Sequence, residues 1–327
     1  MTTFKKLAVF VAITALFTWN LQAQSKNEAI EAYNQGAGLV NTDVKGAIGA
    51  FEKSIAISEQ VGDSAADIRE KSIAILPSLY YKIAYKYYTD KNISAAISAS
   101  KKTIDVSDKY NNDKTKGSAI TLLTQAYMTQ GAAYFKTNEY DKAISAFDSA
   151  LIVSPDYYKA LLPKAQAYVK TNNDEMFGQT IDQFIEKAAD DANQVAAGKK
   201  LALDFYRLAG SKANSAKKYD EAIASLNLAT KYGEDKDVYY QLAKANNEKK
   251  NFTEAAELAQ KGLNLETGAA EAKAKYYYEL GVAQVGKGDK DSACASFKNA
   301  QFGPFVTAAK GQQTNLKCPG AAPAPAK

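Results

Sequence analysis

The side chains that most often carry enzyme chemistry are scarce in this sequence. It contains no histidine, which removes the commonest general base, the Ser–His and Cys–His nucleophile pairs and the commonest neutral metal ligand. Two cysteines are too few for a structural zinc site, which usually takes four nitrogen or sulfur ligands. Neither a Gly-x4-Gly-Lys-Ser/Thr loop for phosphates nor a Gly-x-Gly-x2-Gly motif occurs. We therefore expect no cofactor and no metal site.

Carboxylate pairs are what remains for acid–base chemistry. Asp190-Asp191 and Glu234-Asp235 fall in turns or on polar helix faces, where such side chains are ordinarily solvated. A carboxylate-only glycosidase needs two carboxyls that face each other across a cleft, and no spacing in this chain indicates such a pair. We expect a protein that is not an enzyme, with carboxylate catalysis as a minor alternative.

The N-terminus has the organisation of a cleavable signal peptide over residues 1–23. Lys5-Lys6 precede an apolar run from Leu7 to Trp19, and Leu21-Gln22-Ala23 form a cleavage site before Gln24. The run is shorter than the roughly 20 residues that a permanent membrane helix needs, and no cysteine near the cut suggests a lipid anchor. We expect an exported protein of the periplasm or envelope of a Gram-negative bacterium, with no integral membrane segment after cleavage. An uncleaved anchor is the alternative.

Charge gives little evidence about the partner. The net charge of +5 includes the two lysines of the leader, and acidic and basic residues are mixed along the rest of the chain. No Lys/Arg cluster with interleaved aromatic residues indicates a nucleic-acid track, so no nucleic-acid partner is expected. The oligomeric state does not follow from the sequence.

The elements that would position any site follow an imperfect repeat. One copy reads Tyr127-x2-Gln130-Gly131-x2-Tyr134, then Tyr140, Ala143-x3-Phe147, Ala150 and Pro155. This copy resembles the tetratricopeptide pattern W-x2-L-G-x2-Y…A-x3-F…P and departs from it only at the first two anchors. The resemblance implies helical hairpins that stack into a curved rod, and the usual function of such a rod is to bind another protein.

Further copies are found from the alanine that opens the second helix of each unit. These alanines are Ala47, Ala96, Ala222, Ala255 and Ala293, and the segment from Leu161 to Phe184 is a degenerate unit. We therefore predict an all-α, right-handed α-solenoid of about six to seven hairpins over residues 24–318. A bend is possible at about 158–202, Phe305 to Leu316 is a candidate capping helix, and residues 319–327 form a disordered Pro/Ala tail. Lys109 to Gly117, rich in Asn, Asp and Lys, is predicted to be a long mobile loop.

The repeat signature also predicts how each hairpin packs. Gly or Ala at the eighth place lets the two helices approach closely, and large residues at the eleventh and twenty-fourth places fill the space beside it. Polar pairs are predicted to form the turns between helices: Asn138-Glu139, Lys217-Lys218, Lys250-Asn251 and Gly288-Asp289.

The resemblance places the partner on the first helices of successive units, which line the inner wall. The fifth, ninth and twelfth places form one stripe there. The stripe residues singled out as a partner-binding surface are Tyr81, Tyr85, Tyr88, Met128, Phe135, Arg207, Tyr240 and Tyr278, and Lys244, Asn247 and Val282 share the stripe. An aromatic wall suits an apolar helix or extended peptide in a groove, but ordinary packing between helices explains the tyrosines equally well. Arg207 lacks an asparagine at the ninth place, which disfavours the clamp for a C-terminal carboxylate that chaperone-docking relatives use.

The two cysteines lie in the last repeat and just beyond it. An even pair in an exported chain usually forms a disulfide, so Cys294 and Cys318 are predicted to pin the capping helix; two buried free thiols are the alternative. The function expected from all of this is a protein–protein interaction scaffold. An oligosaccharide-binding envelope protein is the rival, since exposed aromatic rings also stack on sugars.

Overall fold

The computed structural model describes residues 26–320, which are helical throughout and contain no β-strand. The predicted leader, residues 1–23, and the tail from residue 321 lie outside this range. The helices are residues 26–39, α2 Val44–Val61, η1 Gly62–Ala65, α3 Ala66–Thr89, α4 Ile93–Lys109, α5 Asp113–Lys136, α6 Tyr140–Val153, η2 Tyr158–Ala160, α7 Leu161–Lys170, α8 Asp174–Lys187, α9 Ala192–Ser215, α10 Tyr219–Thr230, α11 Lys236–Glu248, α12 Phe252–Leu265, α13 Ala270–Gly286, α14 Lys290–Asn299, η3 Gly303–Phe305 and α15 Val306–Asn315. The predicted all-α solenoid fold is confirmed.

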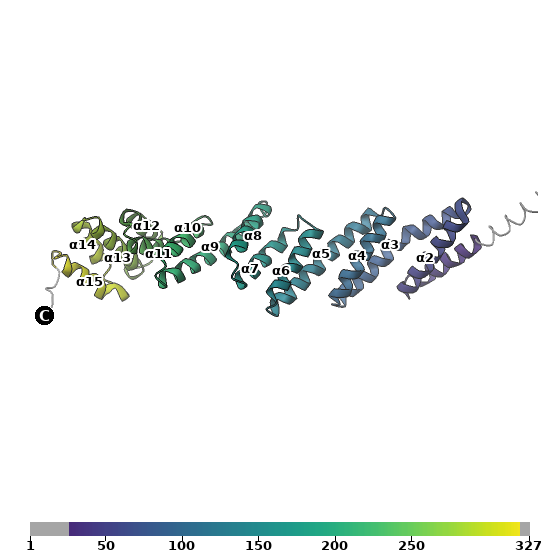
Figure 1. Cartoon of the computed structure of the whole chain (residues 1–327), viewed down its shortest axis with the longest axis horizontal. Helices are drawn as coiled ribbons and strands as arrows, with labels where there is room; N and C mark the ends of the chain where they lie inside the picture. The colour runs from purple at the N-terminus through teal and green to yellow at the C-terminus, as the bar shows by residue number, and fades with distance from the viewer. Residues whose placement is uncertain (1–25, 321–327) are drawn as a thin grey trace, which may run out of the picture. The chain divides into compact units, whose positions relative to one another are not determined.

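The chain separates into two compact units, residues 1–173 and 174–327. In the first, α3 pairs with α4 and α5 with α6, and α7 follows (Figure 1). In the second, α9 pairs with α10, α11 with α12 and α13 with α14, and α15 packs on α14. First helices of successive hairpins also touch, as α3 and α5 do in the first unit and α9, α11 and α13 in the second. The boundary falls within the segment 158–202, where the repeat signature is weakest.

The turns inside the hairpins repeat one backbone geometry. In the hairpins that begin at α3, α5, α9, α11 and α13, the second residue after the first helix has a positive φ, as at Lys91, Asn138 and Lys217. The next amide donates to a carbonyl five residues back, as Asn92 N–H does to the Tyr87 carbonyl at 2.9 Å. This is the bonding of a Schellman helix end. The four predicted polar pairs all occupy such turns.

Packing inside the hairpins follows the small-against-large rule. The opening alanines of the second helices, Ala47, Ala96, Ala143, Ala222, Ala255 and Ala293, are all fully buried. Where the eighth place is glycine, a large side chain from the second helix fills the space: Gly131 faces Phe147, Gly210 faces Leu226 and Gly281 faces Phe297. Where it is Ala84 or Ala243, the twenty-fourth place is the small Ser100 or Ala259. The two positions therefore compensate each other in volume.

The predicted mobile loop at 109–117 is wrong. The helix α4 ends at Lys109 and α5 begins at Asp113, which leaves only three connecting residues. Asn111 takes a positive φ of 53°, and the Asn112 side chain caps α5 by accepting from the Thr115 amide. Asn and Asp are favoured at helix caps as well as in loops, so the same residues specify a sharp turn here.

The C-terminal cap forms as predicted, with a slightly shorter helix. Cys294 on α14 and Cys318 are joined by a disulfide with a Cα–Cα distance of 5.6 Å. The cap is also held by packing, because Ala309 of α15 is fully buried against Ala293, Phe297 and Ala300. The Gln313 side chain donates to the Cys294 carbonyl at 3.0 Å. Covalent and non-covalent contacts therefore both cover the end of the last hairpin.

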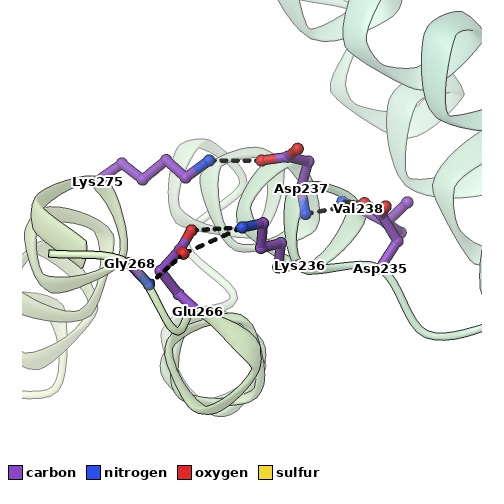
Figure 2. Close-up of polar contacts among 7 residues, drawn as sticks. All are labelled: Asp235, Lys236, Asp237, Val238, Glu266, Gly268 and Lys275. Atoms are coloured by element: carbon purple, nitrogen blue, oxygen red, sulfur yellow. Dashed lines mark hydrogen bonds and ion pairs between the residues drawn. The ribbon is translucent and has the colours of Figure 1, made fainter. Parts of the chain in front are cut away.

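A network of charged side chains fixes the start of α11 (Figure 2). Asp235 caps this helix by accepting from the amides of Asp237 and Val238. Lys236 pairs with Glu266 at 3.0 Å, and Asp237 pairs with Lys275 of α13. The two ion pairs tie α11 to the α12–α13 connection and to α13.

Candidate binding surfaces

The first candidate surface is an aromatic pair on α3. Tyr81 and Tyr85 lie one helical turn apart, and their rings stack at 6.2 Å between centroids with planes 28° apart. Tyr85 is 51% exposed, which is high for a large apolar ring. Neither ring belongs to a core cluster. The exposed Tyr85 ring, with the half-buried Tyr81 beside it, can contact another molecule.

The other three predicted residues of the first unit take part in packing. Tyr88 lies beside the core of Ile97, Leu123 and Ala126, and its hydroxyl is 3.4 Å from that of Thr129 on α5. Met128 and Phe135 pack against the core around Phe147. All three are half-buried, so they offer a partner only part of their surface.

Arg207 in the second unit is held within its own helix. Its guanidinium pairs with Asp204 at 3.0 Å, and Lys200 pairs with the same carboxylate at 2.9 Å. The Lys200 hydrogen bond, with Arg207 contributing, holds the pKa of Asp204 below its usual range. Arg207 is not among the residues that line a pocket with Tyr240 and Tyr278, the two aromatic residues predicted with it in this unit.

Tyr240 and Tyr278 line a pocket of about 550 Å³ in the second unit. All five stripe residues predicted from the last two repeats meet there, although they are spread over α11 and α13. The lining is Tyr240, Lys244, Asn247, Glu248, Lys250, Phe252, Tyr278, Glu279, Val282, Phe305 and Gln312. Phe305 and Gln312 come from η3 and α15, so the disulfide-bound cap completes the pocket. The Tyr278 and Phe305 rings lie 5.5 Å apart.

A buried acid that the sequence analysis did not single out lies in this pocket. Glu279 is 6% exposed. Burial raises its pKa to about 7, against the lowering effect of a hydrogen bond from Asn247 and of the nearby Lys244 charge. The Glu279 carboxyl therefore changes charge near neutral pH. The only sequence signal was an acidic residue between Tyr278 and Leu280, in a stretch otherwise suited to burial.

Asn247 holds Glu279 in place through a contact that recurs between repeats. Its side-chain amide donates to the Glu279 carbonyl at 2.9 Å and to the Glu279 carboxyl at 2.8 Å. One repeat earlier, Asn214 donates in the same way to the carbonyl and side chain of Gln241, both at 2.9 Å. The Tyr88–Thr129 contact has the same place in the first unit. In these three units the residue at the twelfth place of the stripe therefore joins neighbouring first helices.

Other chemistry finds little support in residues 26–320. No group of three or more acidic or cysteine side chains there is placed to hold a metal ion. Within the same range, none of the helices has both the length and the apolar character for a bilayer crossing.

The hairpins with buried small residues at their seams define an α-helical repeat protein. Two stretches match family models described as tetratricopeptide repeat, residues 124–157 and residues 274–301. They coincide with the α5/α6 and α13/α14 hairpins, which carry the Gly131–Phe147 and Gly281–Phe297 contacts. The chain is a tetratricopeptide-repeat protein. Such repeats form protein–protein interaction scaffolds, and the fold is typically non-catalytic.

A curated relative shares one short region. The Outer dynein arm-docking complex subunit 4 of Danio rerio is 33% identical over 66 residues, which is 20% of this chain and 13% of that protein. The chain thus spans only a small part of its length.

Three solved structures illustrate the range of similar folds. The MamA protein is 22% identical, with 62% of this chain and 98% of that chain covered and a TM-score of 0.31. YrrB, described as a tetratricopeptide protein with an unusual peptide-binding site, is 16% identical, with 54% and 84% covered and a TM-score of 0.33. A tetratricopeptide repeat protein from Parabacteroides merdae is 17% identical, with 90% and 99% covered and a TM-score of 0.27. With TM-scores this low, the family assignment rests on the two matched repeats.

Proposed function

We propose that this protein is an exported scaffold of a Gram-negative envelope that holds a protein or peptide partner on its first-helix faces. The observation that carries the proposal is the pocket between α11, α13 and the cap, where five stripe residues from two repeats converge. The Tyr81–Tyr85 pair on α3, in which Tyr85 is exposed and Tyr81 half-buried, supplies a second apolar contact. Rings that are partly exposed and held by a rigid helix lose little entropy on binding, which suits them as anchors.

Partner capture tests the aromatic pair. The partner would be cross-linked in the native envelope, identified, purified and bound again to the purified scaffold. Replacing Tyr81 and Tyr85 by Ala should weaken that binding while the helical circular dichroism signal stays intact. Ile152→Ala is the matched control, because it removes a 79% exposed apolar side chain from α6, a second helix. Unchanged binding by the tyrosine variant would remove α3 from the interface.

Export is supported by the organisation of residues 1–23 and by the paired cysteines, since disulfides persist in oxidising compartments. N-terminal sequencing of protein from the envelope fraction should begin at Gln24. A chain that keeps residue 1 and stays in the cytosol would contradict the envelope assignment.

A glycan ligand is the second candidate, because the exposed Tyr85 ring is also a surface on which a sugar could stack. Calorimetry with soluble glycans separates the two. Saturable heat that is lost in Tyr85→Ala would favour the glycan, and no heat with any glycan would favour the protein partner.

A further inference from the structure

The pocket in the second unit combines aromatic walls with a buried acidic group. Tyr240, Tyr278 and Phe305 come from α11, α13 and η3, and Glu279 lies among them. Tyr240 already takes a cation on its ring, because the Lys275 ammonium lies 5.3 Å from the ring centroid. Aromatic faces attract cations through their quadrupole, and this attraction grows where water is excluded.

The polar side chains of this pocket have hydrogen-bond acceptors that lack donors. Asn247 is 7% exposed, and its amide nitrogen is used twice on Glu279. Its amide oxygen, Oδ1, has no hydrogen-bond partner within the described structure. A buried acceptor without a donor destabilises the structure that holds it. The carboxyl of Glu279 receives one hydrogen bond, at Oε2. A ligand that suits the pocket must therefore bring donors.

The charged side chains that line the pocket are of both signs. The charged groups that face the carboxyl of Glu279 are Lys244 and Glu248 from α11, and Lys250 at the following turn also lines the pocket. The part contributed by α15, Gln312, is neutral, as is Phe252 of α12. Two lysines and two acidic side chains thus line the pocket, and net charge does not by itself select the ligand. The carboxyl of Glu279, which accepts one hydrogen bond and lies among aromatic rings, favours a ligand that donates hydrogen bonds and stacks. Lysine is less suited than arginine, because its compact ammonium is strongly hydrated and does not stack on rings.

We propose that this pocket binds the guanidinium group of an arginine side chain. A guanidinium has five donors and no acceptor, is planar, and stacks on aromatic faces. It would donate to the carboxyl of Glu279 while lying against Tyr240 or Tyr278. The inference rests on the proposed function in one respect: in the cell the arginine belongs to the bound partner.

Binding should depend on pH in a defined direction. The guanidinium pairs with the ionised carboxyl, and in the free protein Glu279 ionises with a pKa of about 7. The apparent affinity is scaled by the fraction of protein in the competent, ionised form. From pH 6 to pH 8 that fraction rises about tenfold, so the affinity should rise about tenfold as well.

The test uses the full chain and the probe acetyl-Gly-Arg-Gly-amide. Binding is followed by calorimetry and by NMR of ¹³C-labelled glutamate side chains at pH 6 and pH 8. The matching citrulline peptide keeps the shape and removes the charge. At pH 8 Glu279→Gln should weaken probe binding about tenfold, since a charge-assisted hydrogen bond is lost, and it should abolish the pH dependence. Glu257→Gln, at an exposed residue of α12 outside the lining, makes the same change in net charge and should leave binding unchanged.

Several results would overturn the inference. They are equal binding of the citrulline peptide, no shift of the Glu279 resonance up to the solubility limit of the probe, or undiminished binding by Glu279→Gln. Competition by a soluble glycan at this pocket would likewise assign it to a sugar. Probe binding without any protein partner would defeat the proposed function alone, whereas a captured partner with no probe binding would defeat this inference alone.

Discussion

Gly131 of α5 lies so close to Phe147 of α6 that a Cβ atom added at residue 131 would come within 2.5 Å of the ring atom Cε1. Phe147 is 1% exposed and fills the seam of its hairpin. The same relationship holds for Gly281 and Phe297, where the distance would be 2.8 Å. The missing side chain is what lets the two helices of a repeat approach.

Gly131→Ala should destabilise the protein. Overpacking a core costs about 1–3 kcal/mol, and the better helix propensity of alanine returns up to about 1 kcal/mol, so we expect a net loss of about 1–2 kcal/mol. Denaturant unfolding measures this loss. Gly117→Ala in the same helix is the control: it is exposed with open space around it, and it should be neutral or stabilising. In a Phe147→Ala background the cost at residue 131 should disappear; an equal cost there would rule out the ring contact as its cause.

Glu279→Gln should stabilise the protein at alkaline pH. The pKa of Glu279 in the folded state, about 7, is above its usual value of 4.5. The stability that this group contributes is therefore fully present below about pH 4.5 and is lost as the pH rises through 7. The penalty for the buried charge reaches roughly 3 kcal/mol above pH 7. Glutamine keeps the acceptor for Asn247 and avoids the charge.

Unfolding at pH 5 and pH 8 measures that difference. Glu279→Gln should match the wild type at pH 5 and exceed it at pH 8, whereas Glu257→Gln should track the wild type at both. A constant offset between Glu279→Gln and the wild type across this range would contradict the assigned pKa.

Reduction of the disulfide should loosen the C-terminal cap. Cys294 and Cys318 are 24 residues apart, and closing a loop of this length stabilises by about 3 kcal/mol when the unfolded chain is constrained. In reductant, amide hydrogens of α15 should exchange faster and binding at the pocket should weaken, because Phe305 and Gln312 belong to the cap. The Cys294→Ser/Cys318→Ser variant should behave like the reduced protein, and adding reductant should not change its exchange rates or its binding. Protection of α15 that is the same with and without reductant would show that packing alone holds the cap.

Lys236→Met should destabilise the second unit at neutral pH. Glu266 is 6% exposed, and it accepts hydrogen bonds from the Gly268 amide and from Lys236 (Figure 2). The Gly268 amide, with Lys236, holds the pKa of Glu266 below its usual range. The resulting stability is present above the usual value of 4.5 and is lost as the pH falls below it.

We expect a loss of stability at pH 7 in chemical unfolding, because buried Glu266 loses one of its partners, and a much smaller difference at pH 3. Lys218→Met breaks an ion pair with Glu221 in which both side chains are at least 60% exposed, and it should cost under about 0.5 kcal/mol. Equal losses of stability in the two variants would mean that burial of Glu266 does not strengthen its ion pair with Lys236.

Much of the fold could be predicted because its determinants are local in the sequence. The opening alanines, the glycine at the eighth place of Tyr127–Pro155 and the polar turn pairs each specify a feature within one hairpin, and all of them hold in the structure. The mobile loop predicted for residues 109–117 is wrong because Asn111 and Asn112 favour both loops and helix caps, and here they form a cap. The choice between loop and cap depended on the helices that flank them.

The sequence by itself determined the helical hairpin, its seam and the stripe to which Tyr240, Lys244, Asn247, Tyr278 and Val282 belong. Tertiary structure decided which stripe residues face a pocket and which join neighbouring helices, because that depends on how far one first helix is displaced along the next. Tyr88 and Tyr85 share the same stripe, yet one packs at the α3–α5 contact and the other is exposed. Tertiary structure also determined the raised pKa of Glu279, because the pKa of an acid depends on the burial and the partners that distant segments supply.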